Sequence, residues 1–133
     1  MPRTTFDDTE RKILNGKNVA VLSTLRADGT IWGTPVWFEL EGDTIVINSA
    51  EGRAWPANLR ERGAVSLTIV DAGNPYQYIS ITGEVASESH DDALDVINRL
   101  AKKYIDEDEY PWHQPGDVRV TFRIRPTRIY RNR

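Results

Sequence analysis

The chain has 133 residues, a formal net charge of −3 and no cysteine. That length suits a single domain, residues 1–133, and the cysteine count excludes disulfides, thiolate nucleophiles and cysteine metal sites. The slight acidic excess disfavours general nucleic-acid binding, and no apolar run reaches the ~20 residues of a membrane helix, so we expect a cytoplasmic protein that binds neither nucleic acid nor membrane.

The first predicted element is a helix over residues 6–15. Phe6, Ile13 and Leu14 share one face of this helix, and Gly16 suits its end. Acidic residues in its first turn complement the positive end of the helix dipole.

Strand patterns then dominate. Asp28 and Gly29 predict a hairpin with a type I′ turn, whose positive φ angles both residue types tolerate. The flanking runs are rich in β-branched and aromatic side chains, as strands are. These runs predict antiparallel strands over residues 19–25, 31–40 and 44–48.

A second helix and two more strands follow. The helix is expected over residues 53–62, with Pro56 in its first turn, where proline is tolerated. The strands are expected over residues 64–70 and 76–88. Within the later strand, Gly83 indicates a bulge or a point of close backbone approach.

The clearest helical pattern begins after Ser89, a good N-cap residue. The apolar residues that recur there at helical spacing are Leu94, Ile97, Leu100, Ala101 and Tyr104. A loop rich in acidic residues, proline and tryptophan spans residues 106–116. Residues 118–125 then alternate apolar residues with arginine and threonine, which predicts a half-buried strand.

The expected fold class is therefore mainly β, an antiparallel barrel of six strands with two or three flanking helices. Closure into a barrel is favoured because it removes exposed strand edges. A parallel α/β fold is disfavoured because helices do not alternate with the strands.

Chemistry carried by the protein alone finds little support. Of the two histidines, His90 suits a surface position at a helix start, and His113 lies in the long loop. No metal-ligand spacing, P-loop, nucleophile elbow or dinucleotide fingerprint is present, so no metal is expected. An enzyme of this kind relies on a cofactor for its difficult step.

One segment suits such a cofactor. After Asn48 the strand gives way to small polar residues, Gly52 permits close backbone approach, and Arg53 enters a helix. A helix N-terminus beside an arginine is an anion site that suits a phosphate group. The alternative is an ordinary strand–helix turn with a surface arginine.

Aromatic residues offer flat surfaces for a ligand. Trp37 and Phe38 are neighbours in one strand, so one is expected in the core and the other in a pocket or interface. Tyr76 and Tyr78 are expected to share one face. Trp55, at an exposed turn, suits stacking on a planar ligand. Ordinary core or interface packing is the alternative for the strand aromatics.

Four stretches, in order, resemble a known family. They are STLRADGTIWGTPVWF, GRAWPANLRERGAVSLTIVD, NPYQYISITGEV, and KKYIDEDEYP with GDVRVTFRIRP. Together they are similar to the F420-dependent branch of the pyridoxamine 5'-phosphate oxidase-like split β-barrel flavin/deazaflavin oxidoreductases. The resemblance implies a six-stranded split barrel and a homodimer with cofactor sites at the interface.

The resemblance also implies which residues contact coenzyme F420, or FMN as the alternative. The expected cofactor-binding residues are Thr34, Pro35, Val36, Trp37, Asn48, Ser49, Ala50, Arg53, Ala54, Trp55, Pro56 and Asn58. The first four are expected along the ring, the next three near the ring and its ribityl chain, and the last five around the phosphate. Arginines of the last strand are expected to help hold the anionic tail, and the loop over residues 110–115 is expected at the mouth of the pocket.

The chain departs from the family pattern in one place. Many members carry a lysine two residues after the arginine, where this chain has Trp55. Tryptophan does not supply that point charge, so either Arg60 or an arginine of the partner supplies it, or phosphate affinity falls. The departure leaves FMN open as the cofactor.

The expected function is hydride transfer from reduced F420 to an electron-poor double bond of a small molecule. Positioning and electrostatics supply most of the acceleration, and solvent, Tyr76 or Tyr78 supplies the proton. The alternatives are an FMN-dependent oxidoreductase of the same fold and a non-catalytic carrier that binds coenzyme or a tetrapyrrole without turnover.

Overall fold

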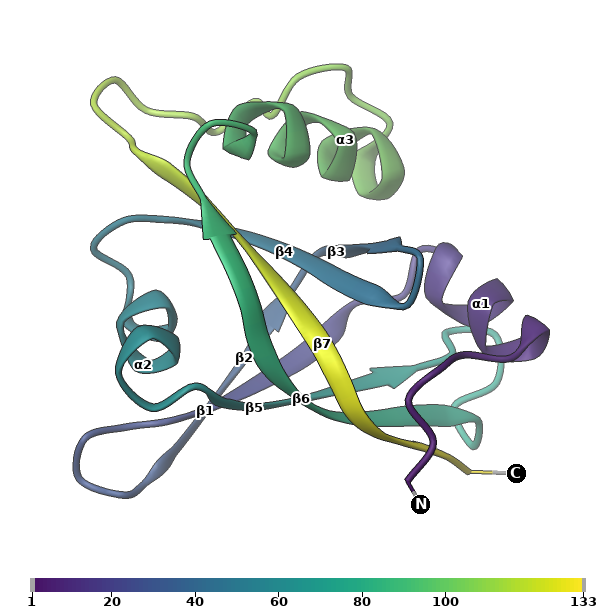
Figure 1. Cartoon of the computed structure of the whole chain (residues 1–133). Helices are drawn as coiled ribbons and strands as arrows, with labels where there is room; N and C mark the ends of the chain where they lie inside the picture. Colours follow the sequence, from purple (N-terminus) through teal and green to yellow (C-terminus); the bar gives the residue numbers. More distant parts are fainter. Residues whose placement is uncertain (1, 133) are drawn as a thin grey trace.

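The computed structural model describes residues 2–132, so residues 1 and 133 of the expected domain lie outside the described residues. Its centre is a strongly curled antiparallel sheet, crossed by the two longest strands, β6 and β7 (Figure 1). The sheet order is β2-β1-β5-β6-β7-β4-β3. The strands are β1 (Ala20–Leu25), β2 (Ile31–Val36), β3 (Phe38–Glu41), β4 (Thr44–Ala50), β5 (Ala64–Val70), β6 (Tyr78–Ser89) and β7 (Arg119–Arg131).

The mainly β class with flanking helices is confirmed, but the described chain has seven strands because the one expected over residues 31–40 divides at Trp37. β2 pairs with β1 and β3 pairs with β4, so the two pieces lie at opposite edges of the sheet order. Only Trp37 separates them in the chain. The curled sheet therefore brings its two edges together at this residue.

Three helices flank the sheet in the described chain: α1 (Asp8–Asn15), α2 (Ala54–Arg62) and α3 (Ala93–Ile105). Pro56 lies in the first turn of α2, as predicted. Gly63 ends that helix in the left-handed conformation, with a φ of 66°. No helix in the described residues is long and apolar enough to cross a membrane.

Helix α3 begins later than the sequence predicted. Ser89 is the last residue of β6, and Asp92 occupies the N-cap position. Because Ser89 still pairs with β7, the chain turns into the helix only after it. Ile97 and Leu100 are buried as predicted, whereas Leu94 is 54% exposed.

The hairpin between β1 and β2 forms, but its turn is not type I′. Gly29 has a positive φ of 85°, whereas Asp28 does not. The Asp28 carboxylate instead accepts hydrogen bonds from the backbone N–H and the hydroxyl of Thr30. This local bonding stabilises the turn without a left-handed aspartate.

Gly83 lies where β6 and β7 approach closely, as predicted. A Cβ at this position would lie 2.7 Å from Cγ2 of Ile124 and 2.9 Å from the carbonyl oxygen of Arg125. The register shifts here, opposite Pro126, which has no N–H for the ladder. With this irregularity, β7 continues past the predicted end at residue 125 to Arg131.

The main core fills the inside of the curled sheet. Phe38 is fully buried there, whereas Trp37 packs against a separate cluster under α3. The prediction that these two neighbours face opposite sides is confirmed.

Candidate functional site

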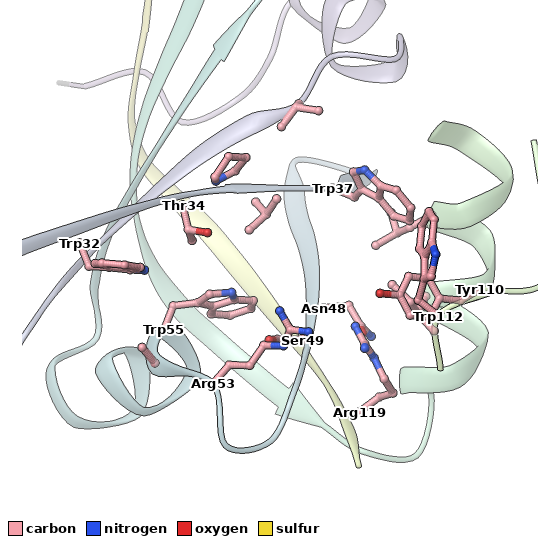
Figure 2. Close-up of a pocket in the computed structure, with 16 residues that line it drawn as sticks. Trp32, Thr34, Trp37, Asn48, Ser49, Arg53, Trp55, Tyr110, Trp112 and Arg119 are labelled. Carbon is pink, nitrogen blue, oxygen red and sulfur yellow. The ribbon is translucent and has the colours of Figure 1, made fainter. Parts of the chain in front are cut away.

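A cavity of about 500 Å³ opens at the corner where the two sheet edges meet (Figure 2). Its lining residues are Val19, Trp32, Thr34, Pro35, Val36, Trp37, Asn48, Ser49, Arg53, Ala54, Trp55, Ile97, Leu100, Tyr110, Trp112 and Arg119. This volume lies in the range of small-molecule sites. The lining residues include two arginines and no aspartate or glutamate, so the cavity favours an anionic ligand.

The N-terminus of α2 forms the first of two positive regions. Arg53 is the N-cap residue and makes no side-chain capping bond, and the first turn holds no acidic residue. The first backbone N–H groups of a helix lack intrahelical partners and carry partial positive charge. Together with the guanidinium, they suit a phosphate group.

Gly52 permits the sharp turn before this helix. Its φ of 92° is in the left-handed region, and a Cβ there would meet no atom within 4 Å. Within the chain, backbone conformation and not crowding therefore explains the glycine.

Arg60 does not replace the missing lysine of the family pattern. Its guanidinium donates to Glu51 at 2.5 and 2.9 Å and to Glu88 at 2.9 Å. These carboxylates raise the pKa of Arg60 well above its ordinary value. Arg60 also lies outside the cavity lining, so its charge is already balanced elsewhere.

Trp55 is not exposed, contrary to the prediction. It is only 6% exposed, and its ring packs on Phe122 with the centroids 5.5 Å apart. Because α2 has already begun at Ala54, the indole turns towards the core. Trp55 therefore gives the cavity an apolar wall without a charge.

Arg119, the first residue of β7, forms the second positive region. It is 8% exposed, and burial lowers its pKa, with Arg53 lowering it further. Its Nε donates to Oδ1 of Asn48 at 2.9 Å. The Asn48 amide in turn donates to the carbonyl of Ala93 at 2.9 Å and to Oγ1 of Thr121 at 3.2 Å, so its orientation is fixed.

An aromatic cluster, Trp37, Tyr110 and Trp112, covers the α3 side of the cavity. The ring centroid of Trp37 lies 6.1 Å from that of Tyr110 and 6.4 Å from that of Trp112. Tyr110 and Trp112 meet nearly edge to face at 5.6 Å. The cluster gives the cavity a flat-walled end beside Arg119.

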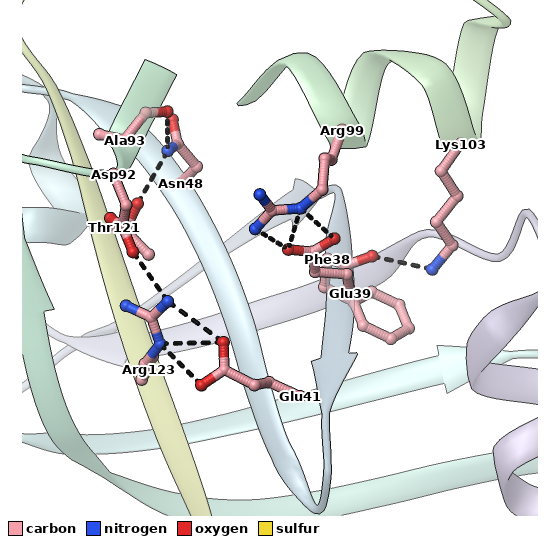
Figure 3. Close-up of polar contacts among 10 residues, drawn as sticks. All are labelled: Phe38, Glu39, Glu41, Asn48, Asp92, Ala93, Arg99, Lys103, Thr121 and Arg123. Atoms are coloured by element: carbon pink, nitrogen blue, oxygen red, sulfur yellow. Dashed lines mark hydrogen bonds and ion pairs between the residues drawn. The ribbon is translucent and has the colours of Figure 1, made fainter. Parts of the chain in front are cut away.

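Two residues of α3 hold the corner from behind. The Tyr104 hydroxyl donates to the carbonyl of Asn18 at 2.8 Å, and Nζ of Lys103 donates to the carbonyl of Leu14 at 2.9 Å. Nζ of Lys103 also donates to the carbonyl of Phe38 at 2.8 Å (Figure 3). Burial lowers the pKa of Lys103 to about 8 and raises that of Tyr104 to about 12.

Most of the predicted cofactor-binding residues lie along the cavity, but three do not. Ala50, Pro56 and Asn58 are outside its lining. The Asn58 side chain instead donates to the hydroxyl of Thr24 at 3.1 Å, which ties α2 to β1.

Neither suggested proton donor lines the cavity. Tyr76 is 85% exposed, and Tyr78 packs on Tyr130 with the centroids 6.1 Å apart. The prediction that both belong to one strand face is wrong, because Gln77 bonds back to the carbonyl of Asn74 and β6 begins only afterwards.

The lining residues outside the predicted cofactor-binding set come mainly from α3 and the loop after it. Tyr110 and Trp112 confirm that the loop over residues 110–115 lies at the pocket mouth, although no periodic pattern predicts its path, and Ile97 and Leu100 were expected only as core. Trp32 and Thr34 are two residues apart on β2, so they face the same side of the strand and both line the cavity. The sequence spacing alone could therefore have added Trp32 to the predicted residues.

The histidines take no part in this lining. His90 lies at the surface, 3.3 Å from a carboxylate oxygen of Glu51, and His113 is exposed. In residues 2–132, no group of three or more histidine and acidic residues is arranged to hold a metal.

Residues 6–133 of the sequence match the family model for pyridoxamine 5'-phosphate oxidase. The chain belongs to the pyridoxamine 5'-phosphate oxidase family. This pyridoxamine 5'-phosphate oxidase family protein is similar to a solved F420 reductase, with 25% identity, a TM-score of 0.80 and 98% of each chain covered.

Two further solved structures share the fold of this pyridoxamine 5'-phosphate oxidase family protein. A conserved hypothetical protein from Mycobacterium tuberculosis is 20% identical, with a TM-score of 0.76 and coverage of 98% of this chain and 88% of the other. A haem-binding protein from Mycobacterium smegmatis is 19% identical, with a TM-score of 0.69 and coverage of 91% and 51%. The expected split-barrel fold is thus confirmed.

Proposed function

We propose that the protein is an F420-dependent reductase that transfers a hydride from the reduced coenzyme to an electron-poor double bond of a small molecule. One observation carries the proposal. The cavity joins an arginine and an open helix N-terminus to flat aromatic walls, and no acidic residue lines it. Such a lining suits a planar ring that carries a phosphate.

The lining residues fit the parts of the coenzyme by their chemistry. Arg53 and the first N–H groups of α2 would hold its phosphate. The strand from Thr34 to Trp37 and the buried indole of Trp55 would lie along its ring. Asn48 keeps its carbonyl oxygen on Arg119, so its side chain supports the site more than it contacts the ring.

The bound coenzyme supplies the hydride, and the protein supplies position and environment. The apolar walls exclude water from the ring, and the two guanidinium groups stabilise negative charge in the cavity. Tyr110 is the tyrosine in the described lining, so its hydroxyl replaces Tyr76 and Tyr78 as the proposed proton donor, with solvent as the other source.

The likeness to an F420 reductase over 98% of both chains supports the same choice. FMN also carries a phosphate and a planar ring, and it would use the same anion site. Haem has less support here, because the described lining contains no histidine, cysteine or methionine for the iron and offers only Tyr110 as a residue of a type that ligates haem.

A homodimer belongs to the proposal. Val21, Ile31 and Pro35 share the outer face of the β1–β2 hairpin, and the first two are 45% and 69% exposed. Val19 and Trp32, also exposed, line the cavity itself. An exposed apolar surface that continues into the cavity suits a second copy of the chain, which would close the site.

Turnover tests the proposal. Reduced F420 should be reoxidised in the presence of the protein and a panel of enones, imines and conjugated acceptors, faster than with each component omitted, while light scattering reports a dimer. Binding of F420 without reoxidation by any acceptor would favour the carrier alternative. Turnover with reduced FMN, and none with reduced F420, would favour the flavin alternative.

A further inference from the structure

Arg119 lacks the ion pairs that Arg123 and Arg125 form on the same strand. Arg123 donates to Glu41 at 3.2 Å and to Asp92 at 2.8 Å (Figure 3), and Arg125 donates to Glu84 at 2.5 Å. Arg119 is the most buried of the three. Among residues 2–132, however, no carboxylate lies within ion-pair distance of it.

A buried guanidinium without an anion is costly. Removing a charge from water is unfavourable unless a partner compensates for it. The neutral Asn48 amide binds only Nε, and the ring of Tyr110 lies 5.0 Å from the guanidinium carbon. Both contacts orient the guanidinium, but neither neutralises its charge. The Asp117 carboxylate favours the charged form from beyond ion-pair distance, but burial has the larger effect and lowers the pKa of Arg119.

The guanidinium lies at the aromatic end of the cavity. Arg119 is beside Asn48, Tyr110 and Trp112, whereas Arg53 approaches from the N-terminus of α2 near Ser49 (Figure 2). Trp112 is 57% exposed and lines the cavity, so part of its ring is accessible to a ligand. This end therefore combines one orienting positive charge with flat apolar surfaces.

We propose that Arg119, Tyr110 and Trp112 form a second anion subsite, which receives the carboxylate of a planar, conjugated substrate. The inference rests on the proposed function, because it assigns Arg53 to the coenzyme phosphate and leaves Arg119 for the substrate. A planar guanidinium binds a carboxylate through two parallel hydrogen bonds, and the aromatic rings hold the conjugated part. The fixed Asn48 amide positions the guanidinium for this role.

A matched pair of probes tests the subsite without turnover. 2-Naphthoate and 2-naphthamide share one ring system and differ in charge. Binding of each, and separately of F420, is measured by titration for the wild type and for Arg119→Gln, Arg119→Lys and Arg53→Gln. Circular dichroism checks that each variant is folded, and Arg119→Lys keeps the charge if the glutamine variant does not fold.

We expect wild type to bind 2-naphthoate at least tenfold more tightly than 2-naphthamide. Arg119→Gln should remove this preference and change F420 affinity by less than threefold. Arg119→Lys should reduce the preference for 2-naphthoate without removing it. Arg53→Gln should weaken F420 and keep the preference. An equal loss of F420 and naphthoate affinity in Arg119→Gln would place Arg119 in the coenzyme site and overturn the inference.

The same titrations separate this inference from the proposed function. Normal F420 binding by the wild type without a preference for 2-naphthoate overturns the second subsite alone. A wild-type protein that binds no F420 overturns the proposed function, whatever the naphthoate result.

Discussion

The indole of Trp37 lies nearly parallel to the phenol ring of Tyr104, with the centroids 5.4 Å apart and the planes 7° apart. Trp37 is the residue at which the chain crosses from one sheet edge to the other, and Tyr104 belongs to α3. The stack therefore fixes the corner of the split barrel to the helix that walls the cavity.

This stack predicts an energetic coupling between the two rings. In a double-mutant cycle with Trp37→Leu and Tyr104→Leu, we expect a coupling of about 0.5–1.5 kcal/mol in the free energy of unfolding. Urea denaturation of the four proteins measures it. The pair Trp37→Leu and Tyr130→Leu, which share no ring contact, should be additive, and additivity in both cycles would contradict a structural role for the stack.

The lowered pKa of Lys103 predicts that the protein becomes more stable as the pH rises into the alkaline range. Its pKa is about 8 in the folded protein, against 10.5 ordinarily. Between these values the unfolded chain binds more protons than the folded protein, so the free energy of unfolding rises with pH. Allowing for partial solvation, we expect wild type to gain about 1–2 kcal/mol relative to Lys103→Met between pH 7 and pH 10. A pH-independent difference in denaturant unfolding would count against the buried ammonium.

The raised pKa of Tyr104 predicts that the protein becomes less stable as the pH rises further. Its folded pKa of about 12 lies above the ordinary 10.0, so the folded protein binds more protons between these values. The resulting stability is fully present below about pH 10 and is lost as the pH rises through about 12. Tyr104→Phe has no phenol to ionise and should lack this loss. The comparison uses denaturant unfolding from pH 9 to pH 12.

We expect Gly83→Ala to disturb the packing between the two long strands, β6 and β7. The added methyl would meet Ile124 and the backbone of Arg125 at less than normal contact distance, so we expect a loss of about 1–3 kcal/mol. Gly33→Ala is a matched strand control, because its nearest neighbour would be a Val21 methyl at 3.8 Å. Equal thermal unfolding of both variants would show that the close approach carries no cost.

The sequence predicted most of the local structure because alternation and helical spacing are local signals. Gly63 and Pro56 marked the limits of α2 correctly, and Gly83 marked the close approach of β6 and β7. The split at Trp37 was not predicted, because alternation continues through it and only long-range pairing with β1 and β4 divides the two strands.

The candidate site was predicted residue by residue where it lies on regular elements, whereas the loop over residues 110–115 was expected only as a part of the pocket mouth. Thr34 and Asn48 lie near the ends of β2 and β4, and Arg53 is the N-cap residue of α2, so their positions could be inferred. The positions of Tyr110 and Trp112 depend on the path of the loop after α3, in which both rings pack on Trp37. Arg119 was expected only generally, among the arginines of the last strand, because its lack of a carboxylate partner is a tertiary property.

Arg53 is the residue on which the account of coenzyme binding depends most. Loss of a charge-assisted hydrogen bond costs about 1.5–3 kcal/mol, so Arg53→Gln should weaken F420 binding by roughly ten- to a hundredfold. Arg128→Gln, an exposed arginine of β7 outside the cavity, should leave the affinity within twofold of the wild type.

Parallel titrations of wild type, Arg53→Gln and Arg128→Gln with F420 and with FMN, followed by fluorescence quenching, test the central claim most directly. The account predicts saturable F420 binding, one per subunit and tighter than FMN, that Arg53→Gln weakens selectively. Preference for FMN, or F420 affinity that is equal in all three proteins, would contradict it.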